Sequence, residues 1–94
     1  MGLNRQRVRV FYSGHVQGVG FRYTVKSLVS GFEVTGIIRN LADRRVELVA
    51  EGEKGELEEF LKAIMESGLG GLVRNTQIAW EEAGGDLKGF AIVG

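Results

Sequence analysis

The sequence of 94 residues lacks cysteine and proline, and it has a single histidine and no long hydrophobic run. Without cysteine, both disulfides and thiolate metal sites are excluded. The spacing of His, Asp and Glu does not match that of a metal site. No hydrophobic run reaches the length of a membrane span, and the N-terminus lacks the apolar core of a signal peptide. We therefore expect no metal centre and no membrane association, and by default a cytoplasmic location.

The composition is that of an ordinary globular domain. Hydrophobic residues account for 44% of the chain and charged residues for 26%, which is typical of folded proteins. A chain of this length suits one domain, and no repeat, linker or low-complexity segment divides it. We therefore expect a single domain over residues 1–94.

Charge is distributed unevenly along the chain, although the formal net charge is zero. Residues 1–45 contain eight Lys and Arg against two acidic residues, a net charge of +6, so residues 46–94 carry −6. A basic half favours a small anionic ligand or a nucleic acid as its partner. The alternative is that these charges are solvated residues of strands and turns without a partner.

Hydrophobic periodicity predicts an α+β fold. Alternating or apolar runs predict strands, and apolar residues at helical spacing predict two helices. The predicted order is a strand (7–13), a helix (21–31), a hairpin of two strands (34–40 and 45–51) with a turn at 41–44, a helix (55–67), a strand (74–82) and a short last strand (90–92). This is the ferredoxin-like βαββαβ arrangement, with two helices packed on one face of an antiparallel sheet and a short extra C-terminal strand. We expect the aromatic residues Phe60, Trp80 and Phe90 in the core.

The most informative stretch, Gly-His-Val-Gln-Gly-Val-Gly-Phe-Arg at residues 14–22, joins the first strand to the first helix. No Ser, Thr, Asp or Asn is present at 18–21 to cap the helix, so its first N–H groups lack a side-chain acceptor. The glycines allow unusual backbone angles and a close approach to a ligand. Arg22 lies in the first helical turn, where the helix dipole disfavours a cation. A bound anion, with phosphate the first candidate, would explain these features together.

Other interpretations of these residues stay open. The loop is neither a Walker A motif nor a dinucleotide fingerprint, and a glycine-rich turn can simply reverse the chain. His15 has no neighbouring carboxylate to orient it, which favours an exposed loop residue over a catalytic base. Gln17 is expected to brace the loop. Asn40 ends the second strand, where it is either an ordinary turn residue or a neutral amide that orients a water molecule.

Two motifs make the sequence similar to the acylphosphatases. The first is the loop signature Gly-x-Val-Gln-Gly-Val-x-Phe-Arg, which is matched by Gly14, Val16, Gln17, Gly18, Val19, Phe21 and Arg22. The second runs from the second strand through the hairpin and is matched by Gly36, Asn40, Asp43, Val46, Glu47 and Gly52. The resemblance covers nearly the whole chain, because length and element order also agree.

The resemblance implies hydrolysis of the carboxyl–phosphate bond of a small acyl phosphate to a carboxylate and inorganic phosphate, without metal or cofactor. It implies that Arg22 binds the phosphoryl group and that Asn40 positions the attacking water. The implied phosphate-binding segment comprises His15, Val16, Gln17, Gly18, Val19, Gly20, Phe21 and Arg22. We expect a monomer with no specific nucleic-acid partner and no membrane partner.

The chain departs from the family pattern at the hairpin turn, which has Asp43-Arg44 where Asp-Gly is usual. If the glycine has a positive φ, then either Arg44 is strained or the turn type differs. We also expect the carboxylate of Gly94 to approach Arg22 and pair with it.

Two other classes of function remain as alternatives to a stand-alone acylphosphatase. Ferredoxin-like sheets also bind RNA through exposed aromatic residues, although the RNP pattern is absent from this sequence. The fold also occurs in small-molecule regulatory domains and in the acylphosphatase-like module of carbamoyl-transferring maturation proteins. The fold alone does not choose among these functions, whereas the site does.

Overall fold

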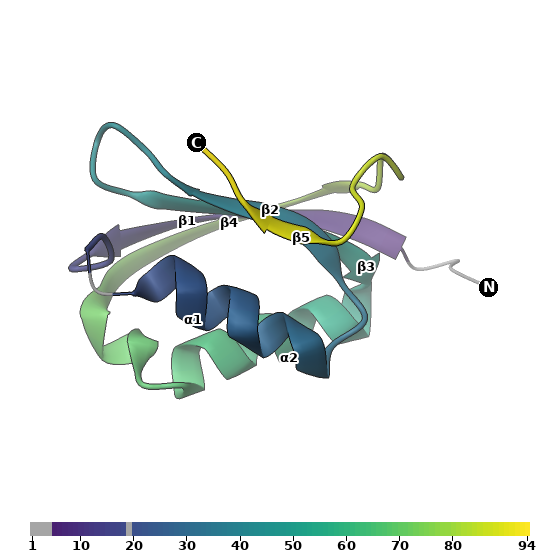
Figure 1. Ribbon diagram of the computed structural model, residues 1–94. Helices are drawn as coiled ribbons and strands as arrows, with labels where there is room; N and C mark the ends of the chain where they lie inside the picture. The colour runs from purple at the N-terminus through teal and green to yellow at the C-terminus, as the bar shows by residue number, and fades with distance from the viewer. Residues whose placement is uncertain (1–4, 19) are drawn as a thin grey trace.

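The computed structural model describes residues 5–18 and 20–94. Figure 1 shows one sheet with both helices packed against the same face. The elements are β1 (Arg5–Gly14), α1 (Phe21–Leu28), the 3₁₀ helix η1 (Val29–Gly31), β2 (Thr35–Asn40), β3 (Val46–Glu53), α2 (Lys54–Glu66), the 3₁₀ helix η2 (Leu69–Leu72), β4 (Val73–Glu82) and β5 (Phe90–Ile92). The predicted helix at 21–31 is therefore an α-helix only to Leu28, and its last turn tightens into a 3₁₀ helix, as is common at helix ends.

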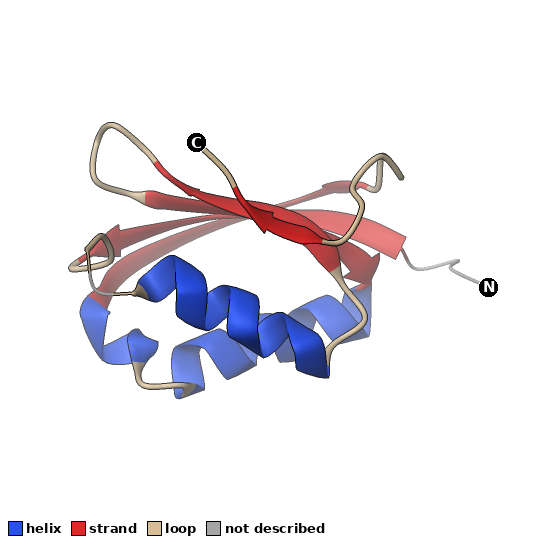
Figure 2. Cartoon of the chain, viewed as in Figure 1, coloured by secondary structure: helices blue, strands red, loops and turns tan. Residues whose placement is uncertain are grey.

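The strands form one sheet in the order β4-β1-β3-β2-β5. β1 pairs antiparallel with β3 and β4, and β2 pairs antiparallel with β3, which confirms the predicted βαββαβ arrangement. The short extra strand β5 runs parallel to β2 and makes the sheet mixed. β1 and β2 run in the same direction, so both strands finish at the same end of the sheet (Figure 2). Their last residues are Gly14 and Asn40. This topology brings the glycine-rich loop and the hairpin turn together.

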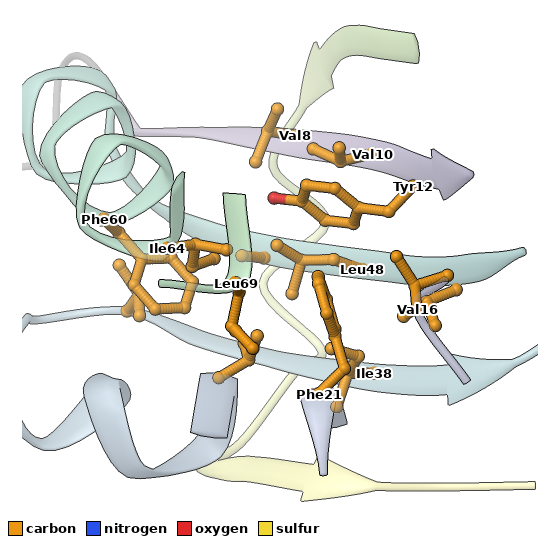
Figure 3. Packing of buried hydrophobic residues seen from close by; sticks show 14 of the residues in the cluster. Val8, Val10, Tyr12, Val16, Phe21, Ile38, Leu48, Phe60, Ile64 and Leu69 are labelled. Carbon is orange, nitrogen blue, oxygen red and sulfur yellow. The ribbon is translucent and has the colours of Figure 1, made fainter. Parts of the chain in front are cut away.

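The core lies between the sheet and the helices (Figure 3). From β1, every second side chain enters it, and Val8, Val10 and Tyr12 are at most 1% exposed. From α2, the predicted helical stripe supplies buried residues that include Phe60 and Ile64. Each such burial stabilises the fold by about 1.5–3 kcal/mol. The periodicities of 2 and 3.6 residues in the sequence therefore specify the two layers.

The tryptophan does not belong to this core, so its predicted burial is wrong. Trp80 is 39% exposed and Ile78 is 51% exposed, although they pair with the buried residues Val8 and Val10. β4 is an edge strand, and its side chains have a neighbouring strand on one side only. The ammonium group of Lys54 lies 5.6 Å from the centre of the Trp80 ring. Phe60 is buried and Phe90 packs against the core, as predicted.

The opposite face of the sheet buries two carboxylates. Glu51 is 1% exposed and accepts hydrogen bonds from Arg7 Nε at 2.6 Å, Gly84 N at 2.9 Å and Gly85 N at 3.1 Å. Burial on its own would raise the pKa of the Glu51 carboxyl, but the hydrogen bonds from these three residues lower it below its ordinary value. Since Gly84 and Gly85 belong to the connection between β4 and β5, this carboxylate fixes that connection to the sheet.

Glu47 forms the second buried ion pair on this face. It is 4% exposed, and its two oxygens accept hydrogen bonds from Arg9 Nη1 at 2.6 Å and Arg39 Nε at 2.7 Å. Burial raises the pKa of Glu47, and the two arginines more than reverse that effect. Both faces of β3 are therefore buried, one by hydrophobic side chains and the other by paired charges. In the described part of the chain, neither α-helix is long and apolar enough to cross a membrane.

Candidate active site

The glycine-rich loop begins where β1 separates from β4. Gly14 has a φ of +126°, and His15 N donates a hydrogen bond to the carbonyl of Leu72 at 2.9 Å. A Cβ atom at Gly14 would lie 2.4 Å from that carbonyl oxygen, so only glycine fits there. The side chain of Val16 then enters the core and is 1% exposed. These contacts fix the start of the loop at the end of the sheet.

Several backbone N–H groups of the loop have no acceptor among the described residues. Gly20, with a φ of +77°, caps α1 without any side-chain hydrogen bond, and its carbonyl accepts the N–H of Thr24 at 2.9 Å. The N–H groups of residues 16–18 and 20–22 donate to no acceptor within the described residues. Val19, which the sequence analysis included in the phosphate-binding segment, lies outside them. The start of α1 therefore has the unpaired donors that bind anions at helix N-termini.

Arg22 is the second residue of α1, directly after the loop that carries these donors. Its side chain is half-buried and has no hydrogen bond or ion pair with any residue that the structure describes. By contrast, four other arginines on the sheet and hairpin are each paired with a carboxylate: Arg7, Arg9, Arg39 and Arg45. An unpaired guanidinium can hold two phosphate oxygens with its planar fork.

The expected ion pair between Arg22 and the C-terminal carboxylate is not formed among the described residues. β5 pairs with β2, and Val93 N continues this pairing by donating to the carbonyl of Ile38 at 3.0 Å. A side chain added at Gly94 would meet the Cβ atom of Arg39 at 3.6 Å. The pairing with β2 therefore holds the chain end beside that strand, which leaves Arg22 without this partner.

Asn40 is the last residue of β2 and is half-buried. Its amide oxygen is buried and has no hydrogen-bond partner among the residues described. Leaving a buried acceptor unpaired costs about 1–3 kcal/mol, so such atoms call for an explanation. The carboxamide of Asn40 carries both donors and an acceptor, which is the chemistry needed for the water-orienting role that the family resemblance implies.

Gln17 ties the loop to the hairpin that Asn40 begins. Its Nε2 atom donates to the carbonyls of Leu41 and Arg45, both at 2.9 Å. This confirms the predicted brace and shows what it holds. The segment that carries the free N–H groups is thereby fixed against the residue that follows Asn40. These two carbonyl acceptors could not be predicted from sequence, because backbone groups of a turn acquire partners only through the fold.

The hairpin turn has the geometry that usually selects glycine. Arg44 N donates to the carbonyl of Leu41 at 3.2 Å, and Leu41 N donates to the carbonyl of Arg45 at 2.8 Å. Arg44 has a φ of +74° and is the only non-glycine residue with a positive φ in 5–18 and 20–94. A three-residue hairpin loop commonly ends with such a left-handed residue. The turn type is therefore retained, and Arg44 is strained.

His15 is exposed, as predicted, and its backbone rather than its imidazole makes the contact with Leu72. No group of three or more His, Cys, Asp or Glu side chains within the described residues could hold a metal ion. The structure thus brings the loop, Arg22 and Asn40 to one end of the sheet. It also adds Arg44, whose position beside the loop the sequence analysis did not predict.

Comparisons with known proteins identify the family to which this chain is similar. Residues 8–92 match the family model described as Acylphosphatase. A protein named Acylphosphatase from Methanospirillum hungatei is 42% identical over 81 residues, covering 85% of this chain and 89% of that protein. Another from Trichormus variabilis is 41% identical over 86 residues, covering 92% and 84%. The crystal structure of acylphosphatase from Bacillus subtilis has a TM-score of 0.83 at 29% identity, covering 94% of this chain and 98% of that chain.

Proposed function

This chain belongs to the acylphosphatase family and hydrolyses acyl phosphates, and we propose which of its residues do so. Arg22 and the unpaired backbone N–H groups of the loop, at residues 16–18 and 20–22, hold the phosphoryl group. Asn40 orients the attacking water. The products are a carboxylate and inorganic phosphate, and residues 1–94 act as one domain. No metal or cofactor takes part.

One observation carries this assignment. The Gln17 side chain joins the loop with the unpaired donors to the hairpin that follows the unpaired amide oxygen of Asn40. The donors and Arg22 are positive, which suits a phosphoryl dianion. The carboxamide is neutral, which suits a water molecule. The positive groups of the loop and the neutral carboxamide of Asn40 therefore lie at one end of the sheet. The loop and the hairpin that carry them are joined by the hydrogen bonds of Gln17.

These few groups are sufficient for the chemistry. Phosphoryl transfer depends mainly on positioning and charge stabilisation, and the leaving carboxylate is weakly basic, so a strong general acid is unnecessary. The water oxygen attacks phosphorus while the bond from phosphorus to the acyl oxygen breaks. The carboxylate leaves with the electron pair of that bond. The proton of the water passes to a phosphoryl oxygen of the substrate itself.

The open face of the sheet supports this enzyme over an RNA-binding module. On the central strands that face carries the ion pairs of Arg9 with Glu47 and of Arg7 with Glu51. Its aromatic residue on β1, Phe11, lies 4.5 Å beneath the guanidinium of Arg45. The face thus presents paired charges, whereas RNA-binding sheets present exposed aromatic rings for base stacking.

The test is hydrolysis of acetyl phosphate by the purified protein with a metal chelator present. Arg22→Ala and Asn40→Ala are each expected to lower kcat/KM by about 10²–10³-fold, as when one transition-state donor is removed. Lys26→Ala, which removes an exposed cation from the last turn of the same helix, is the matched control. Inorganic phosphate should inhibit competitively. Absence of turnover in the parent protein would disprove the function, and full turnover in both variants would disprove the site.

The monomeric state and the cytoplasmic location expected from the sequence stay predictions. Sedimentation equilibrium at micromolar concentration should give the mass of a single 10.3 kDa chain. The proposed reaction also needs no nucleic-acid or membrane partner, and any binding of RNA should be weak and salt-sensitive.

A further inference from the structure

A polar cavity lies where the loop meets the hairpin. It has a volume of about 290 Å³ and is lined by Gly14, His15, Gln17 and Arg44. Gln17 is both a wall of this cavity and the brace between the loop and the hairpin. The cavity therefore adjoins the proposed phosphate site. Small-molecule sites begin at roughly 300 Å³, so this volume is at the lower end of their range.

Arg44 is the cation of this cavity that has no partner inside the protein. The exposed Arg44 guanidinium makes no hydrogen bond or ion pair within the described chain. The neighbouring Arg45, in contrast, bonds to Asp43 at 2.8 Å and Gln77 at 3.4 Å and covers the ring of Phe11. The backbone of Arg44 is also in the left-handed region, which is unfavourable for a residue with a Cβ atom. A strained residue with an unused charge beside an active site is a candidate for a role in binding.

We infer that this cavity binds the acyl part of the substrate and that Arg44, which lines it, pairs with a second anionic group on that part. The inference rests on the proposed function, since it concerns the same substrate. The preferred substrates are then acyl phosphates whose acyl chain ends in a carboxylate or a phosphate. The Arg44 fork can accept either group. The exposed side chain of His15 lines the same cavity and offers ring N–H donors to that group.

The test compares benzoyl phosphates that differ only in the para substituent: a carboxylate, a phosphonate or a neutral carboxamide. For each anionic substrate, the preference is its kcat/KM divided by that of the carboxamide. Dividing this preference in the parent by that in a variant cancels differences in leaving-group reactivity. Arg44→Gly is expected to lower the preference by about 5- to 20-fold, as for a partly exposed charge-assisted pair. The anion with the larger change identifies the distal group.

Two further variants make the result decisive. Arg44→Glu should lower the preference more than Arg44→Gly, because it adds repulsion. Lys62→Ala removes one positive charge from the exposed surface of α2 and should leave the preference unchanged. Circular dichroism verifies that each variant is folded. If Arg44→Gly does not fold, the comparison of Arg44→Glu with the parent protein decides the question.

An unchanged preference in a folded Arg44 variant that still hydrolyses benzoyl phosphate would overturn this inference and leave the proposed function intact. An equal fall in Lys62→Ala would also overturn it, since the effect would then come from net charge. Failure of the parent protein to hydrolyse any of the substrates would instead overturn the proposed function.

Discussion

Replacing Arg44 with glycine should make the protein more stable, although it removes a side chain of this chain's proposed binding cavity. The φ of +74° at Arg44 costs a residue with a Cβ atom about 1–2 kcal/mol. Glycine avoids that cost, but its greater freedom in the unfolded chain offsets about 0.5–1 kcal/mol. Subtracting one range from the other gives between zero and about 1.5 kcal/mol, so we expect a gain of about 0.75 kcal/mol in the free energy of unfolding.

The substitution removes no contact of Arg44 that would change this difference in the free energy of unfolding. Its guanidinium makes no hydrogen bond or ion pair with a described residue, so none is lost. Its backbone N–H, which donates to the carbonyl of Leu41 at 3.2 Å, is present in glycine as well. For a domain of this size, about 1 kcal/mol corresponds to roughly 4–8 °C in Tm. A gain of about 0.75 kcal/mol should therefore raise the Tm of the glycine variant by roughly 3–6 °C.

Thermal and urea unfolding at neutral pH measure this difference. Arg44→Ala retains the strain and should stay within about 0.5 kcal/mol of the parent. Arg44→Asn should lie between the alanine and glycine variants, because asparagine tolerates the left-handed region. The urea midpoint should rise without a change in the m-value. Equal stabilities of the glycine and alanine variants would refute the reasoning, since backbone strain distinguishes them.

Three further predictions concern the buried carboxylates and the brace. Glu51→Gln leaves the charge of Arg7 without its buried partner but retains an acceptor for the loop amides, so urea unfolding should show a loss of about 1–3 kcal/mol. The pKa values of Glu47 and Glu51 are below the ordinary value of 4.5, so the unfolded chain binds more protons in acid. Their contribution to stability is complete above pH 4.5 and is lost as the pH falls through the lowered values. A titration of unfolding free energy from pH 6 to pH 2 should show this fall, and a profile in Glu51→Gln as steep as in the parent would contradict it. Gln17→Leu removes both hydrogen bonds to the hairpin, and we expect about 1–2 kcal/mol less stability and at least roughly 10-fold lower kcat/KM for acetyl phosphate. Unchanged kinetics in that variant would show that the brace does not position the site.

Local patterns predicted most of the fold because they reflect contacts that are repeated along one element. The alternation through Val8, Val10 and Tyr12 and the helical stripe around Phe60 both correspond to buried faces. Trp80 shows where such a pattern is insufficient. Its alternation is correct, but burial depends on whether another element covers that part of the sheet, and β4 is at the edge.

The sequence by itself determined the periodicity of the elements, the glycine-rich turn with its uncapped helix, and an arginine in an electrostatically unfavourable position. These are properties of neighbouring residues, which backbone sterics and hydrogen-bonding capacity decide. Only the tertiary structure brought Asn40 to the loop, buried its amide oxygen, aligned Gln17 with two hairpin carbonyls and placed Arg44 in the left-handed region beside a cavity. Those features depend on the parallel alignment of β1 and β2 on either side of β3, which joins residues distant in the chain.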